Sequence, residues 1–268
     1  DRGTAHYKSK LLAHLAPGGT AIISADYPDL AREARAVRQE LVFFSTSGRQ
    51  VDYRAAYVVP AGEDKGLFRL WLDGVSIDVE APFRGAFGAE NVIAVAAVAH
   101  RLGLGAEEIA AGFAGAALPK QRFACSRAGD WLVIDDSYNA SPVSMKAGLE
   151  VLGSMEPDGK GRKIAILADM KELGQDAPRF HREIGAYIAG HPVDQVVLLG
   201  GLAAEIGYGL GGSASPVPVV FCEELEQVGQ WLYENLRQGD CVLFKGSNSM
   251  KLSQAVRHLE EWKGREGS

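Results

Sequence analysis

The sequence predicts an α/β protein of two domains, and two patterns lead to this fold class. Beyond Leu118-Pro119-Lys120-Gln121, short apolar runs alternate with amphipathic stretches, as in a doubly wound, Rossmann-like parallel sheet. Residues 53–83 instead alternate apolar and polar positions around Asp73-Gly74, which is typical of an antiparallel hairpin. We therefore expect an α/β plus antiparallel β domain over residues 1–118 and a doubly wound domain over residues 119–268.

The first domain contains helical and extended patterns in turn. Apolar residues at Tyr7, Leu11, Leu12 and Leu15 predict a helix over 7–15, which Pro17-Gly18-Gly19 ends. Strands are expected at 20–24 and 41–45, with a helix over 30–38 between them. After the antiparallel section, two Ala-rich helices are expected over 91–102 and 106–114, the first of them buried.

The second domain repeats a strand followed by a helix. The expected strands are 131–135, 163–168, 195–199, 217–222 and 241–245. The expected helices are 143–155, 178–189, 202–209, 224–237 and 251–262. Ser141 is placed to cap the first of these helices, and Pro142 then occupies the first helical position, where a missing N–H costs nothing.

Composition limits the classes of function. The chain is 47% hydrophobic and 23% charged, so we expect an ordinary soluble protein with a core, and its net charge of −6 argues against non-specific nucleic-acid binding. No apolar run approaches the ~20 residues of a membrane span, and no signal peptide is visible. The odd set of Cys125, Cys222 and Cys241 favours free thiols in a reducing, cytoplasmic compartment. Because the sequence opens with Asp1-Arg2, we expect a fragment or a processed chain.

The turn after the first strand of the second domain is the main candidate site. The strand ends in Asp135-Asp136 and leads directly into a helix, which is where α/β folds bind ligands. Amides at the helix start suit a phosphate, and a carboxylate suits ribose hydroxyls. Because side chains alternate along a strand, we assign the nucleotide to Asp136 and a structural role or none to Asp135. The alternative interpretation is a capped turn with solvated acids.

No phosphate-binding loop of the form Gly-x-x-x-x-Gly-Lys-[Ser/Thr] occurs in the chain. Lys245-Gly246-Ser247 follows an expected strand but lacks the upstream glycine. Gly200-Gly201 and the later glycines do not have dinucleotide-binding spacing, so we interpret them as helix ends and loops. The chain by itself is therefore not expected to orient the γ-phosphate of ATP.

The run Asp-Asp-Ser-Tyr-Asn-Ala-Ser-Pro-x-Ser-Met at residues 135–145 resembles a signature of the Mur ligase family, in which Asn is usual where Ser141 stands. Three further runs resemble family motifs in the same order. Leu118–Phe123 resembles a Gly-Arg-[Leu/Phe] step with Gln121 for Gly, and Ile166–Gly174 resembles Gly-Asp-Met-x-Glu-Leu-Gly with Ala168 for the first Gly. Phe244–Met250 resembles Lys-Gly-Ser-Arg-Ser-Met, with Asn248 for Arg.

The resemblance implies roles for residues of the second domain. Arg122, Asp136, Tyr138 and Asn139 would bind the nucleotide, and Asp169, Lys245 and Ser247 would bind the amine substrate. Backbone amides of residues 247–249 at a helix start would suit a carboxylate. His181 matches a histidine common in the family, although a histidine in a helix is more often structural or solvated.

The first domain departs further from the family pattern. Phe83–Asn91 covers Gly-x-His-Asn-x-x-Asn, with Phe87 for His and Gly88 for Asn, and Asn91 would contact adenine. Lys8 aligns with a lysine that the family carbamylates, so it would be catalytic and help to hold Mg²⁺. Without the resemblance, Lys8 is interpreted as a surface charge.

The function implied is an ATP-dependent amide ligase of peptidoglycan precursor synthesis, with ATP and Mg as cofactors. It would add D-Ala-D-Ala to UDP-MurNAc-tripeptide through an acyl phosphate, in the cytoplasm and as a monomer, and so serve cell wall biogenesis, cell shape and cell division. One alternative is a related ligase with another amino-acid acceptor. The second alternative is a non-catalytic binding module that keeps the fold, which the departures at Phe87, Gly88, Ser141 and Asn248 favour slightly.

Overall fold

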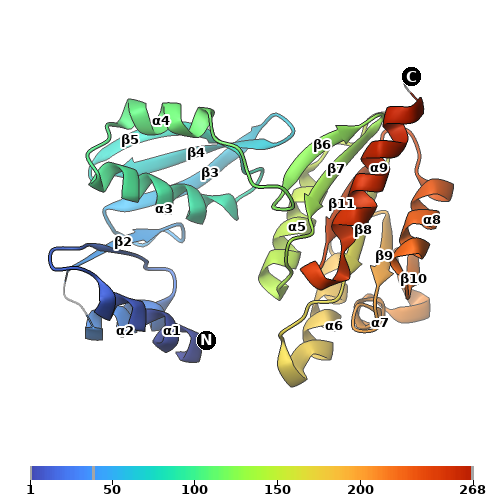
Figure 1. Ribbon diagram of the computed structural model, residues 1–268, viewed down its shortest axis with the longest axis horizontal. Helices are drawn as coiled ribbons and strands as arrows, with labels where there is room; N and C mark the ends of the chain where they lie inside the picture. Colours follow the sequence, from blue (N-terminus) through green and yellow to red (C-terminus); the bar gives the residue numbers. More distant parts are fainter. Residues whose placement is uncertain (1, 38–39, 267–268) are drawn as a thin grey trace. The chain divides into compact units, whose positions relative to one another are not determined.

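A computed structural model describes residues 2–37 and 40–266. The chain divides into two compact units, Asp1–Ala117 and Leu118–Ser268, which are called unit 1 and unit 2 (Figure 1). Arg38, the last residue of the helix expected over 30–38, lies outside the described residues. In the described part of the chain, no helix is both long and apolar enough to cross a membrane.

Unit 1 is built on a five-stranded mixed sheet. Its strand order is β1 (Ala21–Ser24), β2 (Leu41–Ser45), β3 (Tyr53–Ala61), β4 (Lys65–Leu72) and β5 (Val75–Ala81). The first three strands are parallel and the last three antiparallel, and the antiparallel part is the one that the sequence predicts. Asp73 and Gly74, with φ of 47° and 90°, form the expected hairpin turn between β4 and β5.

Among the described residues of unit 1, the α-helices are α1 (Arg2–Ser9), α2 (Pro28–Val37), α3 (Gly88–Arg101) and α4 (Ala106–Ala114). The burial of α3 is confirmed, because Val92, Ile93 and Ala96 are fully buried against the sheet. The helix expected over 7–15 is wrong in its bounds. It begins at Arg2, ends at Ser9 and continues as a 3-10 stretch over Lys10–His14.

The apolar stripe from which that helix was predicted is not a buried face. Tyr7 is 75% exposed and Leu11 72% exposed, whereas the buried positions of this segment are Ala5 and Ser9. Small residues face inward here, since α1 contacts α2 closely. Periodicity therefore found the helix but assigned the wrong face.

Unit 2 is built on a six-stranded sheet. Its strand order is β10 (Val219–Cys222), β9 (Gln195–Leu199), β8 (Lys163–Ala168), β11 (Cys241–Lys245), β7 (Trp131–Asp136) and β6 (Ala124–Ala128). Five strands are parallel, and β6 is an antiparallel edge strand that the sequence analysis did not predict. A signal was present, because Gly129-Asp130 separates β6 from β7 with a two-residue turn.

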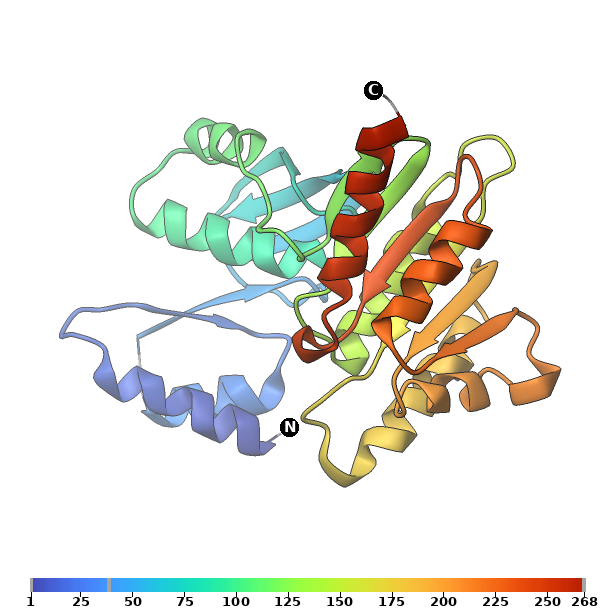
Figure 2. The same cartoon turned by 45° about the vertical axis from the view of Figure 1, so that its right-hand side comes forward.

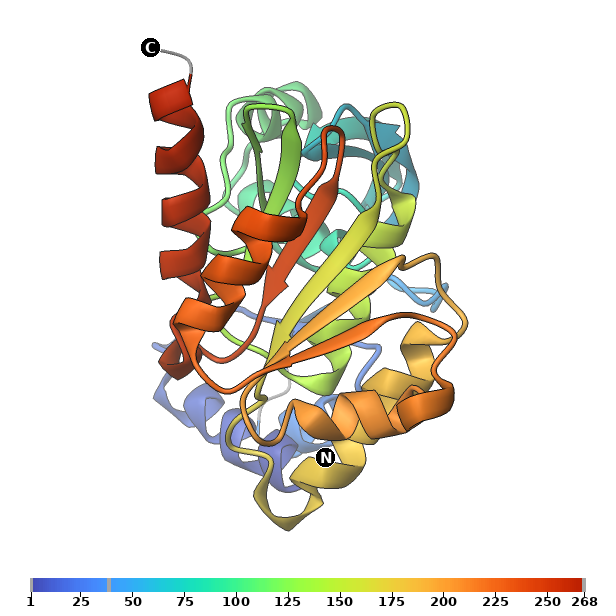
Figure 3. The same ribbon diagram turned by 90° about the vertical axis from the view of Figure 1, so that its right-hand side faces the viewer.

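Helices cover both faces of this sheet (Figures 2 and 3). One layer holds α5 (Pro142–Ser154), α6 (Ala177–Ile188) and α7 (Ala204–Gly209), and the other holds α8 (Leu225–Asn235) and α9 (Leu252–Glu266). The doubly wound arrangement is thus confirmed. Cys222 and Cys241 are buried, Cys125 is half-buried, and none of these three forms a disulfide.

Two loops meet at the amino-terminal edge of the unit 2 sheet, backbone against backbone. A Cβ at Gly161 would lie 2.0 Å from the carbonyl oxygen of Gly239, and a Cβ at Gly239 would lie 2.1 Å from that of Asp158. Beside them, Asp240 is fully buried and accepts hydrogen bonds from the Arg162 backbone and guanidinium. This edge is therefore closed by the chain itself.

Candidate functional site

The carboxyl ends of three adjacent strands place most predicted site residues at one edge of unit 2. β11 lies between β7 and β8, and Lys245 stands in register with Asp136 on one side and Leu167 on the other. Asp136 is the last residue of β7, Asp169 begins the turn after β8, and Ser247 follows β11. Parallel strands expose such turns together, so this edge collects the candidate groups from distant parts of the sequence.

The centre of this edge is a buried ion pair between Asp136 and Lys245. Asp136 is 5% exposed and Lys245 is 1% exposed. The Lys245 ammonium donates to Oδ2 of Asp136 and to the carbonyl oxygen of Asn139, at 3.2 Å. Burial raises the pKa of Asp136 to about 6, although Lys245 and the Phe123 amide favour its ionised form, and burial lowers the pKa of Lys245.

Asp135 lies on the opposite face of β7, as alternation predicts. Its Oδ1 accepts hydrogen bonds from the Ser137 amide at 3.1 Å and the Ser137 hydroxyl at 2.6 Å. Burial raises the pKa of this carboxyl, and these hydrogen bonds and the charge of Arg257 oppose that shift. The two neighbouring aspartates therefore have separate partners, and Asp135 closes its own turn.

The segment Leu118–Phe123, called the lead segment, lies against the turn after β7. The Tyr138 amide donates to the Gln121 carbonyl at 3.1 Å, and the Arg122 guanidinium carbon lies 4.1 Å from the centre of the Tyr138 ring. Arg122 is exposed and the Tyr138 side chain is 45% exposed. This cation–π pair is thus open to a ligand.

The same turn continues into α5 through a complete cap. Ser141 is the N-cap residue, its hydroxyl accepts the Ser144 amide at 3.3 Å, and Pro142 is the first helical residue. The predicted cap is confirmed. Asn139 is exposed, and its side-chain oxygen accepts the Ala140 amide at 2.8 Å. The exposed groups that this turn offers to a ligand are therefore the Tyr138 ring and the amide nitrogen of Asn139.

Asp169 and Ser247 meet between β8 and β11 through one backbone hydrogen bond, and the Ser247 side chain binds the neighbouring Lys171 backbone. The Ser247 amide donates to the Asp169 carbonyl at 3.1 Å, and the Ser247 hydroxyl accepts the Lys171 amide at 2.9 Å. The expectation of free amides at 247–249 is therefore wrong for Ser247. The helix expected over 251–262 is α9, which begins at Leu252, so residues 247–249 precede it and Asn248–Met250 form a 3-10 turn.

The Asp169 carboxylate is satisfied within the chain. It accepts the Ala203 amide at 2.7 Å and the Lys171 ammonium at 2.8 Å, and it is 4% exposed. Gly200, with φ of 104°, leaves room for it, since a Cβ there would lie 2.6 Å from Oδ1 of Asp169. The Lys171 side chain is 46% exposed. Lys171 is thus the exposed cation of this group, and the sequence analysis did not single it out because it occupies a variable position of its motif.

His181 has a structural role beside this group. It is fully buried, its Nε2 accepts the Met170 amide at 2.9 Å, and its Nδ1 lies 2.7 Å from the Ala177 carbonyl. This pairing requires the neutral tautomer with hydrogen on Nδ1. His181 therefore fixes the turn that holds Asp169.

Lys8, one of the two residues predicted in unit 1, lies at a cleft of about 630 Å³ that residues of α1, α2, β1, β2 and α3 line. Lys8 is exposed and lines this cleft with Ser24, Tyr27 and Glu90. Glu90 accepts a hydrogen bond from the Tyr27 hydroxyl at 3.0 Å. Asn91 follows Glu90 and is exposed on α3. Tyr27 and Glu90 were not predicted, although Glu90 adjoins the motif that marks Asn91.

The family departures at Phe87 and Gly88 have a packing explanation. A Cβ at Gly88 would lie 2.2 Å from Cβ of Phe83, and the Phe83 and Phe87 rings meet edge to face at 6.1 Å. An asparagine at position 88 would therefore displace Phe83. At positions 87 and 88 this chain therefore has a packed Phe83–Phe87 contact where the family usually has polar side chains.

A metal would find only part of its ligand set in unit 1. Among the described residues, no three His, Cys, Asp or Glu side chains lie close enough together to hold a metal ion. The cleft does offer the hard oxygen donors that Mg²⁺ prefers, from Glu90 and Ser24, beside the accessible amine of Lys8. These residues fit part of a Mg²⁺ ligand set, and the remaining ligands would have to come from other groups.

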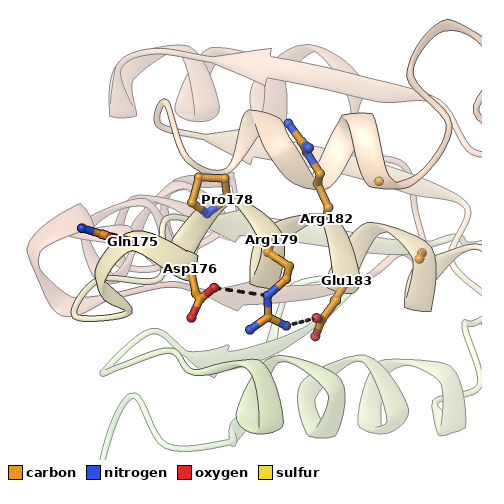
Figure 4. Close-up of a pocket in the computed structure, with 8 residues that line it drawn as sticks. Gln175, Asp176, Pro178, Arg179, Arg182 and Glu183 are labelled. Atoms are coloured by element: carbon orange, nitrogen blue, oxygen red, sulfur yellow. Dashed lines mark hydrogen bonds and ion pairs between the residues drawn. The ribbon is translucent and has the colours of Figure 1, made fainter.

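A further hollow of about 580 Å³ lies over the start of α6 and contains none of the predicted site residues (Figure 4). Its charged groups are paired with one another. Arg179 bonds Asp176 at 3.4 Å and Glu183 at 2.5 Å. The Arg182 guanidinium points away from these and bonds Glu205 at 2.6 Å. This surface therefore has its charges balanced within the chain.

Comparison with known proteins gives consistent matches over both units. A profile described as the Mur ligase middle domain matches residues 3–99, and one described as the Mur ligase glutamate ligase domain matches residues 121–248. The UDP-N-acetylmuramoyl-tripeptide--D-alanyl-D-alanine ligase of Bacillus subtilis is 31% identical over 97% of this chain and 55% of its own length. The Escherichia coli ligase of that name is 29% identical, over 97% and 56%. The chain thus spans about half the length of these curated relatives.

Solved structures agree. A crystal structure of MurF from Acinetobacter baumannii is 25% identical with a TM-score of 0.82, covering 97% of this chain and 55% of that one. MurF ligase from Thermotoga maritima, solved in complex with ADP, shares the fold at 23% identity and a TM-score of 0.76, covering 92% and 54%. The two profiles account for most of both units. The chain therefore belongs to the Mur ligase family.

Proposed function

We propose that the chain is the nucleotide- and amine-handling part of an ATP-dependent ligase that adds D-Ala-D-Ala to UDP-MurNAc-tripeptide. The observation that carries this proposal is the 31% identity to the Bacillus subtilis ligase over nearly the whole chain. The carboxyl edge of unit 2 also supports it. There, the motif residues Asp135 and Asp136 of β7 lie in register with Phe244 and Lys245 of β11. Because the relatives are about twice as long, the complete reaction is a proposal for the full-length gene product.

In this proposal the Arg122–Tyr138 pair and Asn139 meet the nucleotide. A guanidinium is suited to phosphate or ribose oxygens, and an exposed ring next to it is suited to stacking. Asp136 would accept ribose hydroxyls, and the four lone-pair sites of a carboxylate leave capacity beyond Lys245 and Phe123. Asn91 of unit 1 would bind the adenine edge. The ADP in the Thermotoga maritima complex is consistent with a nucleotide ligand.

The amine substrate is assigned to the edge between β8 and β11. Asp169, Lys245 and Ser247 were predicted for this role, and all three are buried. Asp169 and Ser247 hold the turns that display Lys171, whose exposed ammonium could receive a carboxylate. The Lys245 ammonium points inward and bonds Asp136 instead. Positioning and charge neutralisation are the main contributions expected from such a site.

Lys8 is proposed to act as a carbamate that helps to hold Mg²⁺. Mg²⁺, when bound, would neutralise the developing charge on the transferred phosphoryl group. The exposed amine of Lys8 is open to carbon dioxide, and Glu90 shares its cleft. Since three free cysteines fit a reducing compartment, we place this reaction in the cytoplasm.

The test is phosphate release by the full-length gene product. Release that requires ATP, UDP-MurNAc-tripeptide and D-Ala-D-Ala together supports the proposal. Release with another amino acid in place of D-Ala-D-Ala would instead establish a related ligase, and release with no combination would favour the binding module. Lys8→Ala should abolish turnover, and Lys10→Ala, two residues along the chain and also exposed, is its matched control.

The 268-residue chain alone should not turn over ATP, because its sequence contains no phosphate-binding loop to orient the γ-phosphate. Metal-dependent ATP hydrolysis by the purified chain, lost in Lys8→Ala, would overturn this assignment of roles.

A further inference from the structure

The Lys245 side chain is enclosed along its whole length. It is 1% exposed, and a Cβ added at Gly148 on α5 would lie 3.0 Å from its Cδ. The ammonium donates to Asp136 and to the Asn139 carbonyl, and it lies 5.5 Å from the centre of the Phe123 ring. A buried ammonium is stable only when such partners replace water. Its hydrogen-bonding capacity is thus largely used within unit 2.

The lead segment has an unusual backbone beside this group. Gln121 and Phe123 have φ of 64° and 52°, in the left-handed region that residues other than glycine seldom occupy. Such conformations persist where surrounding contacts determine them. Two contacts do so here, because the Phe123 amide donates to the Asp136 carboxylate and the Gln121 carbonyl accepts the Tyr138 amide.

Both contacts depend on groups that Lys245 holds. Asp136 is its ion-pair partner, and Tyr138 lies between Asp136 and the Asn139 carbonyl, which are its two acceptors. Arg122 stands between the two left-handed residues and is thereby presented over the Tyr138 ring. The buried Lys245 ammonium therefore determines the geometry of the exposed Arg122–Tyr138 pair.

We propose that Lys245 is a positioning residue and not a substrate contact. Its ammonium joins the ends of β7 and β11 to the lead segment, and thereby fixes the Arg122–Tyr138 pair at the edge where the nucleotide would bind. The contribution to nucleotide affinity rests on the proposed function, whereas the effect on the backbone does not.

The first experiment measures amide hydrogen exchange in the chain and in Lys245→Met, which keeps the length of the side chain and removes its charge. The Phe123 and Tyr138 amides should exchange at least tenfold faster. The Met170 amide, held by His181 away from this pair, should change less than twofold. Lys160→Met, in an exposed loop at the other edge of the sheet, is the matched control and should change neither.

Lys245→Met leaves the Asp136 carboxylate buried without its cation, so the protein could fail to fold. Asp136→Leu/Lys245→Met removes both charges and serves as the second variant, because loss of both partners costs much less than loss of one. Its Tyr138 amide, whose own acceptor is untouched, should still exchange tenfold faster. Unchanged exchange, or an equal increase throughout unit 2, would overturn the proposal.

The second experiment compares Michaelis constants in the full-length gene product. Lys245→Met should raise the KM for ATP at least tenfold and change the KM for D-Ala-D-Ala less than twofold. The reverse pattern would make Lys245 a contact of the amine substrate and overturn the proposal. If the gene product does not use D-Ala-D-Ala, the proposed function fails. The amide hydrogen exchange experiment still decides the role of Lys245, because it does not depend on activity.

Discussion

At the scale of single residues, two aspartates show how surroundings decide the behaviour of one side chain. Burial opposes ionisation of both. At Asp26, hydrogen bonds from Ser45, Ser47 and Thr46 outweigh that effect and lower the pKa to about 2. At Asp136, burial prevails over the ion pair and the pKa rises to about 6. Many short donors stabilise a carboxylate more effectively than one buried cation does here.

Asp26 joins the ends of β1 and β2, so its ionisation should stabilise unit 1. Because its folded pKa lies below the ordinary value of 3.8, the stabilisation is complete above about pH 4 and is lost as pH falls toward 2. For a carboxylate that is 15% exposed we expect about 1–2 kcal/mol. A carboxyl-carbon titration by NMR should show a midpoint near 2 for Asp26. In Asp26→Asn the acid dependence should weaken, whereas Asp29→Asn, at a half-exposed carboxylate paired with Arg32, should leave it intact.

Asp136 and its neighbour should separate nucleotide binding from structure. In the full-length gene product, Asp136→Ala should raise the KM for ATP about tenfold to a hundredfold, as expected for loss of about 1.5–3 kcal/mol from a charged hydrogen bond. Asp135→Ala, which loses only the Ser137 contacts, should chiefly lower the melting temperature. A raised KM in Asp135→Ala alone would reverse the assignment of this turn.

At the scale of elements, α5 shows how local sequence sets the site. Its cap uses the hydroxyls of Ser141 and Ser144 reciprocally, with Pro142 between them. This cap ends the turn that bears Tyr138 and Asn139. The serine that departs from the family pattern therefore performs the capping task of the usual asparagine, since both side chains accept an N3 amide.

Ser141→Ala should destabilise unit 2 by about 1 kcal/mol, the usual value of an N-cap hydroxyl. In a domain of this size, that corresponds to a fall of roughly 2–4 °C in melting temperature. Ser141→Asn should retain most of the wild-type value. Equal losses in both variants would show that the serine is required for something other than its cap.

Sequence reasoning found the elements whose pattern is local and long. The parallel strands of unit 2 and the Asp73-Gly74 hairpin follow from apolar runs and turn chemistry. It missed β6, because Ala124–Ala128 has few β-branched or aromatic residues and becomes a strand only by pairing with β7. Likewise, only the packing of α1 reveals that Ala5 and Ser9 face inward.

The candidate site was predictable as a set of motifs but not as a set of contacts. The sequence indicated Asp136 and Lys245 separately, 109 residues apart. The two side chains form an ion pair because β7 and β11 are neighbours in the sheet, and no local sequence pattern reveals that strand order. Lys171 and Glu90, which are polar groups beside motif residues, were not singled out either.

At the scale of the whole molecule, each unit has its own core. That of unit 2 includes Val133, Ile164, Val242 and Phe244 of the sheet, packed against Val256 of α9. A polypeptide of residues 119–268 should therefore unfold in one cooperative transition. Its thermal unfolding midpoint, followed by the fluorescence of Trp131, Trp231 and Trp262, should lie within a few degrees of the midpoint of unit 2 in the whole chain. A broad transition without cooperativity would contradict the predicted boundary.

The glycine contact at the amino-terminal edge of unit 2 gives the two edges of this sheet different tolerance to mutation. At Gly161 and Gly239 any side chain would collide with backbone, which cannot rotate away. Variants there would lower the cellular abundance of the protein and leave the affinity of surviving molecules unchanged. At the carboxyl edge, variants of exposed Arg122 or Tyr138 would leave the abundance unchanged and lower the affinity. In a saturation screen that scores only growth, both edges would look equally essential. A separate measurement of protein abundance would distinguish the amino-terminal edge, where variants impair folding, from the carboxyl edge, where variants impair binding.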